Sequence, residues 1–171
     1  MNPNNLLGRP LLDEYYMAIA FAVSMRAACL NRSIGAVITV SDGELSSIAG
    51  TGYNSPEIGA SNCVTCRRRE EGYKSGEGLH RSRSIHAEIN GLLQCARYGR
   101  SINGGTIYVT DSPCSLCSRA LVNAGIKKIV YCGEYPDSES EDILKNAGVE
   151  TFKVNKENVL NRLKGQIEAF L

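Results

Sequence analysis

The sequence contains no tryptophan and only three phenylalanines among its 171 residues, and its net charge is only +1. Proteins that track single-stranded nucleic acid use aromatic side chains as stacking platforms and carry an excess of basic residues. Both features are scarce here, so we expect no nucleic-acid partner. One basic run, Arg67, Arg68 and Arg69, either contacts a phosphate or forms a solvated surface segment with Glu70 and Glu71.

Long apolar segments are also missing. No run approaches the about 20 residues that cross a bilayer, and residues 1–5 lack the basic start of a secretory signal. We therefore expect no membrane partner and a cytoplasmic location, which is the host cytoplasm if the source is viral. The seven cysteines are an odd number, and in a reducing compartment paired cysteines predict metal ligands or catalytic groups ahead of disulfides.

The hydrophobic pattern predicts one α/β domain over residues 1–171. Apolar residues at helical spacing predict helices, and short β-branched runs predict strands. The expected helices cover 11–29, 85–98, 114–124, 137–146 and 157–171, and the expected strands cover 34–40, 46–52, 106–110, 127–132 and 149–154. This order predicts a three-layer α/β/α sandwich with a central mixed five-stranded sheet. Residues 53–83 have no period, and so long a loop is uncommon unless it is functional or held in place.

Two short segments carry residues suited to a catalytic metal. Cys114 and Cys117 form a Cys-x-x-Cys at the start of a predicted helix, which places two thiolates on one side of its first turn. His86, at the start of another helix, supplies a third ligand, and three protein ligands leave one zinc position open for water. Zinc lowers the pKa of such a water to about 7. Both helix N-termini direct the positive end of their dipoles at this centre, which favours thiolate over thiol.

Glu88 lies two residues after His86 and faces another direction, so we expect a proton carrier rather than a fourth ligand. It would take a proton from water, deliver it to a ring nitrogen and later protonate a departing amine. Each feature alone has another interpretation: a redox pair or structural zinc for Cys-x-x-Cys, an ordinary helix-start histidine, and a surface or capping carboxylate. Together, His-x-Glu and Pro-Cys-x-x-Cys are the known signature of zinc nucleobase deaminases.

Beyond these motifs, the sequence resembles the cytidine and deoxycytidylate deaminase superfamily, and within it the deoxycytidylate (dCMP) deaminases of phages and bacteria. The similarity extends over residues 15–154 and includes segments 26–37, 52–55, 106–114 and 124–131. It implies a cytidine deaminase-like fold and a zinc-dependent hydrolase that converts dCMP to dUMP and ammonia, supplying dUMP for dTMP synthesis. The alternatives are another cytosine nucleotide or nucleoside as substrate, a nucleic-acid-editing deaminase, and a non-catalytic zinc module.

The resemblance implies a role for each matched residue. It implies that the zinc ligands are His86, Cys114 and Cys117, and that the general acid and base is Glu88. The implied substrate contacts are Asn54 at the sugar, the backbone amide of Ala87 at the base carbonyl, Arg26 at the phosphate, and Tyr135, near Asp137, at one side of the pocket. A turn-forming asparagine, a solvated arginine and a packing tyrosine are the structural alternatives.

The dCMP deaminases often form homohexamers that dCTP activates and that dTTP with Mg²⁺ inhibits. The resemblance therefore implies a homo-oligomer, these two effectors and Mg²⁺. Regulation in the family is associated with the loop that is here Gly52, Tyr53, Asn54 and Ser55. Ser55 replaces the last glycine of the family's loop, and serine is unfavourable there if the position needs a positive φ.

Relatives also carry a structural zinc in the aperiodic region. The ligands implied here are Cys29, Cys63, Cys66 and His80. They would form a closed Cys3His site, and the metal would hold residues 53–83 in order. We expect Cys95 and Cys132 to be buried small hydrophobic residues.

Overall fold

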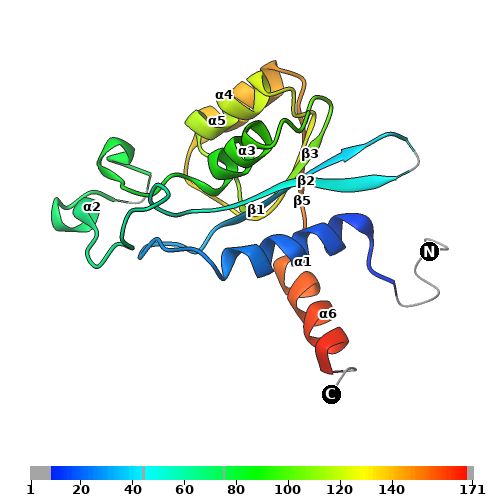
Figure 1. Cartoon of the computed structure of the whole chain (residues 1–171), viewed down its shortest axis with the longest axis horizontal. Coiled ribbons are helices and arrows are strands. Elements are labelled where there is room, and N and C mark those ends of the chain that lie inside the picture. Colours follow the sequence, from blue (N-terminus) through cyan, green and yellow to red (C-terminus); the bar gives the residue numbers. More distant parts are fainter. Residues whose placement is uncertain (1–8, 44, 75, 169–171) are drawn as a thin grey trace.

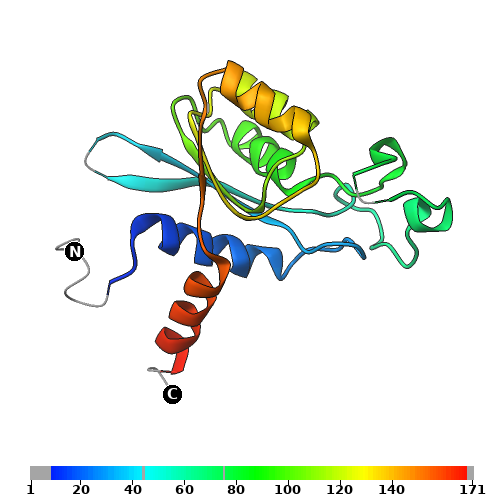
Figure 2. The ribbon, with the colours of Figure 1, turned by 180° about the vertical axis from the view of Figure 1, so that it is seen from behind.

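A five-stranded mixed sheet lies between two layers of helices in the computed structural model, which describes residues 9–43, 45–74 and 76–168 (Figures 1 and 2). The strands are β1 (Gly35–Ser41), β2 (Ser46–Tyr53), β3 (Thr106–Asp111), β4 (Lys128–Gly133) and β5 (Glu150–Lys153). Their order in the sheet is β2-β1-β3-β4-β5. β1 is antiparallel to both neighbours, whereas β3, β4 and β5 are parallel. The predicted α/β/α sandwich is confirmed.

Helices cover both faces of this sheet (Figure 1). One face carries α1 (Leu12–Ser24) and α6 (Lys156–Glu168), and the other carries α3 (Ala87–Arg97), α4 (Ser115–Asn123) and α5 (Ser138–Asn146). The short helices α2 (Arg67–Glu70) and η2 (Leu79–Arg81) interrupt the aperiodic segment at one end of the molecule. No helix in the described ranges has the length and apolar character needed to cross a bilayer. Residues 1–5 and the predicted helix end at 169–171 lie outside the described residues.

Alternating side chains of the central strands form two cores, because successive residues of a strand face opposite sides of the sheet. Val37, Tyr108 and Val130 are buried in the core shared with α1 and α6. Ile38 and Ile107 are buried in the other core, beneath α3 and α4. The central strands are therefore apolar on both faces, as a sheet between two helical layers requires.

Most element ends lie within one or two residues of those expected, and the largest difference is at the end of α1. α1 ends at Ser24 rather than at residue 29, because the backbone amide of Ala28 donates to the carbonyl oxygen of Asn54 at 3.0 Å instead of continuing the helix. The aperiodic segment is closed at its base by an antiparallel bridge between Ser55 and Ile85. Long-range backbone hydrogen bonds of this kind leave no signal in local periodicity.

The sheet topology gathers several loops at one edge. β2 and β3 are both antiparallel to β1, so they run in the same direction, and β4 is parallel to β3. The carboxyl ends of these three strands therefore share one edge, where α/β proteins commonly bind ligands. The Ser55–Ile85 bridge returns the chain to the end of β2, so that α3 begins beside the start of α4.

Candidate active site and metal centre

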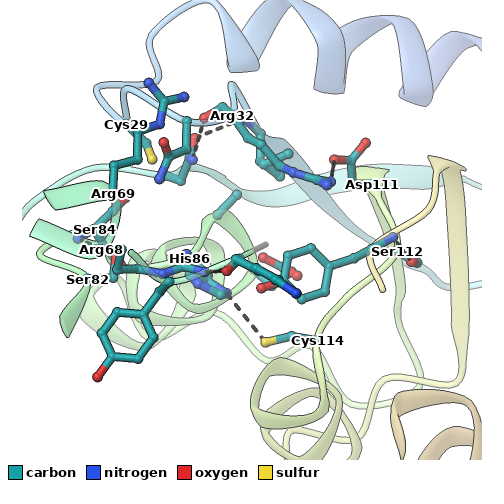
Figure 3. A pocket seen from close by; sticks show the side chains of 18 residues that line it. Cys29, Arg32, Arg68, Arg69, Ser82, Ser84, His86, Asp111, Ser112 and Cys114 are labelled. Carbon is teal, nitrogen blue, oxygen red and sulfur yellow. Dashed lines mark hydrogen bonds and ion pairs between the residues drawn. The ribbon is translucent and has the colours of Figure 1, made fainter. Parts of the chain in front are cut away.

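Three metal-binding side chains meet between the first turns of α3 and α4. His86 precedes α3 as its N-cap, Cys114 precedes α4 as its N-cap, and Cys117 lies in the first turn of α4. The His86 Nδ1 atom is 3.5 Å from Cys114 Sγ and 3.4 Å from Cys117 Sγ. Figure 3 shows His86 and Cys114 facing each other across the floor of the pocket.

These distances fit a tetrahedral zinc ion. Zn–S bonds of about 2.3 Å and a Zn–N bond of about 2.0–2.1 Å at tetrahedral angles place nitrogen and sulfur about 3.6 Å apart. The charges fit as well, because a hydrogen bond from the Cys117 thiol lowers the pKa of Cys114 to about 4. The same hydrogen bond, with burial, raises the pKa of Cys117. The two sulfurs thus hold one negative charge by themselves, and a second thiolate requires a cation between them.

Glu88 lies beside this donor set, in the first turn of α3. Its side chain is only 4% exposed, and burial raises the pKa of Glu88 to about 7. A carboxyl group with a pKa near neutrality both accepts and donates protons at physiological pH. The site therefore holds a proton carrier next to three potential metal ligands.

Two of the three donor residues, His86 and Cys114, and Glu88 form the floor of a cavity of about 360 Å³. His86, Ala87, Glu88 and Cys114 line it on the α3–α4 side. The opposite wall comes from the segment between α1 and β1 and from the region around α2, which contributes Arg68. This volume suits a small organic ligand, and most of its lining comes from loops at the carboxyl edge of the sheet.

Asp137 fastens the cysteine-bearing turn to α5. Its Oδ2 atom accepts a hydrogen bond from the amide of Ser115 at 2.7 Å, and its Oδ1 atom caps α5 by accepting one from the amide of Ser140 at 3.3 Å. Burial alone would raise the pKa of Asp137, but the hydrogen bonds from Ser115 and Ser140 hold that pKa below its usual range. The hydroxyl of Ser140 also donates to the carbonyl oxygen of Pro113 at 2.8 Å. Asp137 therefore supports the metal centre and does not line the cavity.

Three of the four predicted substrate contacts line the cavity. They are Asn54, Ala87 and Tyr135. Arg26 is exposed in the turn that follows α1 and does not belong to the lining residues, which in this segment begin at Cys29. The structure thus separates the predicted phosphate contact from the other three.

The polar atoms of Asn54 and Tyr135 are used differently. The Asn54 side chain accepts a hydrogen bond from the amide of Ile34 at 2.9 Å and donates one to the carbonyl oxygen of Arg32 at 2.7 Å. It thereby joins β2 to the start of β1, and Oδ1 retains one lone pair for a ligand. The Tyr135 hydroxyl is buried without a hydrogen-bond partner, and the guanidinium of Arg32 lies 5.3 Å from the centre of its ring.

The four residues implied for a second zinc are not assembled in one coordination sphere. Cys29, Cys63 and Cys66 line a second cavity of about 160 Å³, but His80 does not. The exposed His80 ring instead packs edge-on against Tyr73, with 6.2 Å between ring centres. Within the described ranges, the donor set at α3 and α4 is the one group that brings three ligand atoms within 4.8 Å of one another.

The loop linked to regulation forms the end of β2. Gly52 and Tyr53 belong to that strand and do not line the cavity. Ser55 exchanges backbone hydrogen bonds with Ile85 at 3.2 and 2.8 Å. No non-glycine residue in the described part of the chain has a positive φ, so serine is compatible with the backbone at position 55. Cys95 and Cys132 are buried, as expected.

Several charged residues of the cavity lining received no definite role from the sequence motifs: Arg32, Arg68, Arg69, Lys74 and Asp111. The basic run that contains Arg68 and Arg69 was noted only as either a phosphate contact or a solvated segment. Arg32 donates to Asp111 at 2.8 Å across the top of the site (Figure 3). Asp111 lies three residues before the predicted metal ligand Cys114, and this proximity could have identified it as a pocket residue from the sequence. Arg68 belongs to the aperiodic segment, where no pattern indicates which side chains face the pocket.

Comparisons with known proteins agree with this site. Residues 11–133 match the family described as the cytidine and deoxycytidylate deaminase zinc-binding region. The deoxycytidylate deaminase of Enterobacteria phage T4 is 36% identical over 181 aligned positions, covering 86% of this chain and 91% of that protein. The deoxycytidylate deaminase of Mycobacterium phage D29 is 40% identical over 130 positions, covering 73% of this chain and 97% of that protein.

A solved structure gives the same result. The dCMP deaminase from cyanophage S-TIM5, crystallised in complex with dCMP and dUMP, superposes with a TM-score of 0.70 at 33% identity. The superposition covers 85% of this chain and 98% of that one. The family match contains more than half of the chain and includes the three donor residues and Glu88. This chain therefore belongs to the cytidine and deoxycytidylate deaminase family.

Proposed function

We propose that this chain hydrolyses dCMP to dUMP and ammonia, and so supplies dUMP for dTMP synthesis. The observation that carries this proposal is the donor set of His86, Cys114 and Cys117 beside the buried Glu88, at a cavity of about 360 Å³. The two phage relatives described above are both deoxycytidylate deaminases. We propose that the whole chain acts as a single deaminase domain in the cytoplasm, which is the host's if the source is viral.

His86, Cys114 and Cys117 would hold the catalytic zinc ion. When bound, zinc supplies the Lewis acidity that makes water a nucleophile near neutral pH. Hydrolysis joins the water oxygen to C4 of cytosine, and the bond from C4 to the exocyclic nitrogen breaks. Glu88 takes one proton from the water and delivers it to N3. It then takes the second water proton from the hydroxyl on C4 and transfers it to the departing amine, so that C4 keeps the oxygen as a carbonyl. Its pKa of about 7 suits both directions of transfer.

The other wall residues hold the substrate. The backbone amide of Ala87 is proposed to donate to the base carbonyl, because this residue lines the cavity between His86 and Glu88. Asn54 is proposed to accept from the sugar with its remaining lone pair. Tyr135 is proposed to donate its otherwise unpaired hydroxyl to the substrate. Orientation by these groups brings C4 to the reacting centre and lowers the entropic part of the barrier.

Glu88→Gln tests the mechanism, because glutamine retains the size and loses the proton transfer. We expect kcat for ammonia release from dCMP to fall by about 10²–10⁴-fold, while metal analysis shows unchanged zinc content. Glu141→Gln, on the exposed side of α5, is the matched control and should retain activity. Full activity in the Glu88 variant would refute the assigned role. Turnover of dCMP, CMP and deoxycytidine by the unmodified protein identifies the preferred substrate.

We also propose a second, structural zinc held by Cys29, Cys63, Cys66 and His80. Three of these residues surround one small cavity. Burial alone would raise the pKa of Cys66, but hydrogen bonds from the backbone of Arg69 and from the Asn31 side chain, at 3.0 Å, lower that pKa and favour the thiolate. A metal ion would draw His80 away from Tyr73 to complete the set.

Regulation and assembly follow the family pattern in this proposal. We propose a homohexamer that dCTP activates and that dTTP with Mg²⁺ inhibits. The backbone at Ser55 supports retained regulation, because the position needs no positive φ. Light scattering with and without dCTP, combined with initial rates in the presence of dTTP and Mg²⁺, measures assembly and regulation separately.

A further inference from the structure

Three buried polar side-chain atoms lack any hydrogen-bond partner within the described residues. They are Asn31 Oδ1, Arg68 Nε and Tyr135 OH. All three residues line the cavity above the metal centre. Buried polar atoms in folded proteins are nearly always paired, and leaving one unpaired costs about 1–3 kcal/mol. Their convergence on one cavity indicates that a ligand supplies the missing partners.

Arg68 is held in place over this cavity. Its Nη2 atom donates to the carbonyl oxygen of Lys74 at 3.1 Å, which leaves Nε–H directed elsewhere. The segment after α2 packs against the loop that carries Tyr135, because a Cβ on Gly76 would lie only 3.3 Å from the carbonyl oxygen of Pro136. In Figure 3, Arg68 lies with Ser82 on the His86 side of the pocket. The guanidinium is thus positioned for a ligand that also reaches the metal centre.

The charges of the lining favour an anion. Arg68, Arg69 and Lys74 line the cavity, and in the described part of the chain no acidic group lies within salt-bridge distance of them. Asp111 is paired with Arg32 at 2.8 Å. Cations without acidic partners in a partly enclosed pocket attract a negatively charged group. An uncharged nucleoside would leave this part of the wall without a complementary partner.

We propose that Arg68 binds the 5′-phosphate of the substrate and makes the enzyme select nucleotides over nucleosides. This inference rests on the proposed dCMP deaminase function. A phosphate oxygen accepts from Arg68 Nε–H, and a second oxygen accepts from the Tyr135 hydroxyl. Asn31 Oδ1 needs a donor, and a water molecule bound to the phosphate supplies one. Arg68 thereby takes the role that sequence resemblance implied for Arg26, which lies outside the cavity.

Binding of the product measures this contact without depending on turnover. Calorimetric titration of zinc-loaded protein with dUMP and with deoxyuridine compares ligands that differ only in the phosphate. Charge-assisted hydrogen bonds are strong enough that Arg68→Gln should raise the Kd for dUMP about 10- to 100-fold. The Kd for deoxyuridine should not change. Arg68→Lys keeps the charge without the planar guanidinium, so its Kd for dUMP should lie between those of the unmodified protein and Arg68→Gln.

Arg67→Gln is the matched control, because this exposed neighbour on the same helix changes the net charge equally and does not line the cavity. It should bind dUMP like the unmodified protein. Rates with dCMP should show the Arg68→Gln effect mainly in KM. An unchanged Kd for dUMP, or equal weakening of dUMP and deoxyuridine, would overturn the role of Arg68 while deamination of dCMP still stood. Failure of the unmodified protein to deaminate dCMP would instead overturn the proposed function.

Discussion

Gly52 lies where β2 passes against the first turns of α3, and the two backbones are too close for a side chain. A Cβ at this position would lie 2.1 Å from the carbonyl oxygen of Ala87 and 2.3 Å from the amide nitrogen of Gly91. Ordinary van der Waals contact begins at 3.4 Å, so Gly52→Ala requires α3 and β2 to separate by more than about 1 Å. Both contacts are with backbone atoms, so no side-chain rotation relieves them.

The displaced helix α3 carries the reacting groups. Its first residue is Ala87, which lies between His86 and Glu88. Overpacking a close contact costs about 1–3 kcal/mol of unfolding free energy, and each kcal/mol lowers Tm by about 2–4 °C in a chain of this length. A misplacement of about 1 Å at a reacting centre lowers the rate by about 100-fold. We therefore predict that Gly52→Ala reduces kcat/KM for dCMP about 100-fold, with a modest loss of Tm.

Ammonia release, thermal unfolding and zinc content measured on one preparation separate these effects. Gly165→Ala on α6 is the control, because a Cβ there meets nothing within 4 Å. It should leave activity unchanged and stabilise the helix by about 0.5–1 kcal/mol. If Gly52→Ala had normal activity and normal Tm, the close approach of β2 to α3 would not be what positions His86 and Glu88.

Two further predictions concern the supports of the site. Asp137→Ala should lower the unfolding free energy by about 1 kcal/mol at pH 7, because it removes a helix cap. The folded-state pKa of Asp137 lies below its usual value of 3.8, so this stabilisation is present above that value and disappears as pH falls through the folded-state pKa. Denaturant titrations at pH 7 and pH 3 measure this loss, with the exposed Asp142→Ala as control. An equal loss of unfolding free energy in Asp137→Ala at both pH values would contradict the prediction. For the second zinc, metal analysis should find about two zinc ions per chain and one fewer in Cys63→Ser, whereas a count near one in the unmodified protein removes that site.

Most of the fold was predictable because the helices have apolar residues at helical spacing and the strands are short β-branched runs. Residues 34–40 and 106–110 are short β-branched runs, and neighbours such as Val37 and Ile38, which face opposite sides of the sheet, are both buried. Element ends were less predictable. α1 stops at Ser24 because Ala28 pairs with Asn54, which lies beyond the hairpin of β1 and β2 in the chain.

The sequence by itself determined the parts of the site that depend on short spacing. Cys114 and Cys117 lie one helical turn apart, and Glu88 follows His86 by two residues, so their relative directions follow from helix geometry. Only the tertiary structure decided what surrounds them: the burial that raises the pKa of Glu88, the placement of Arg68 over the cavity and the exclusion of Arg26 from it. These depend on strand order and on loops closed by distant backbone pairs, and local residue patterns carry no information about which distant segments meet.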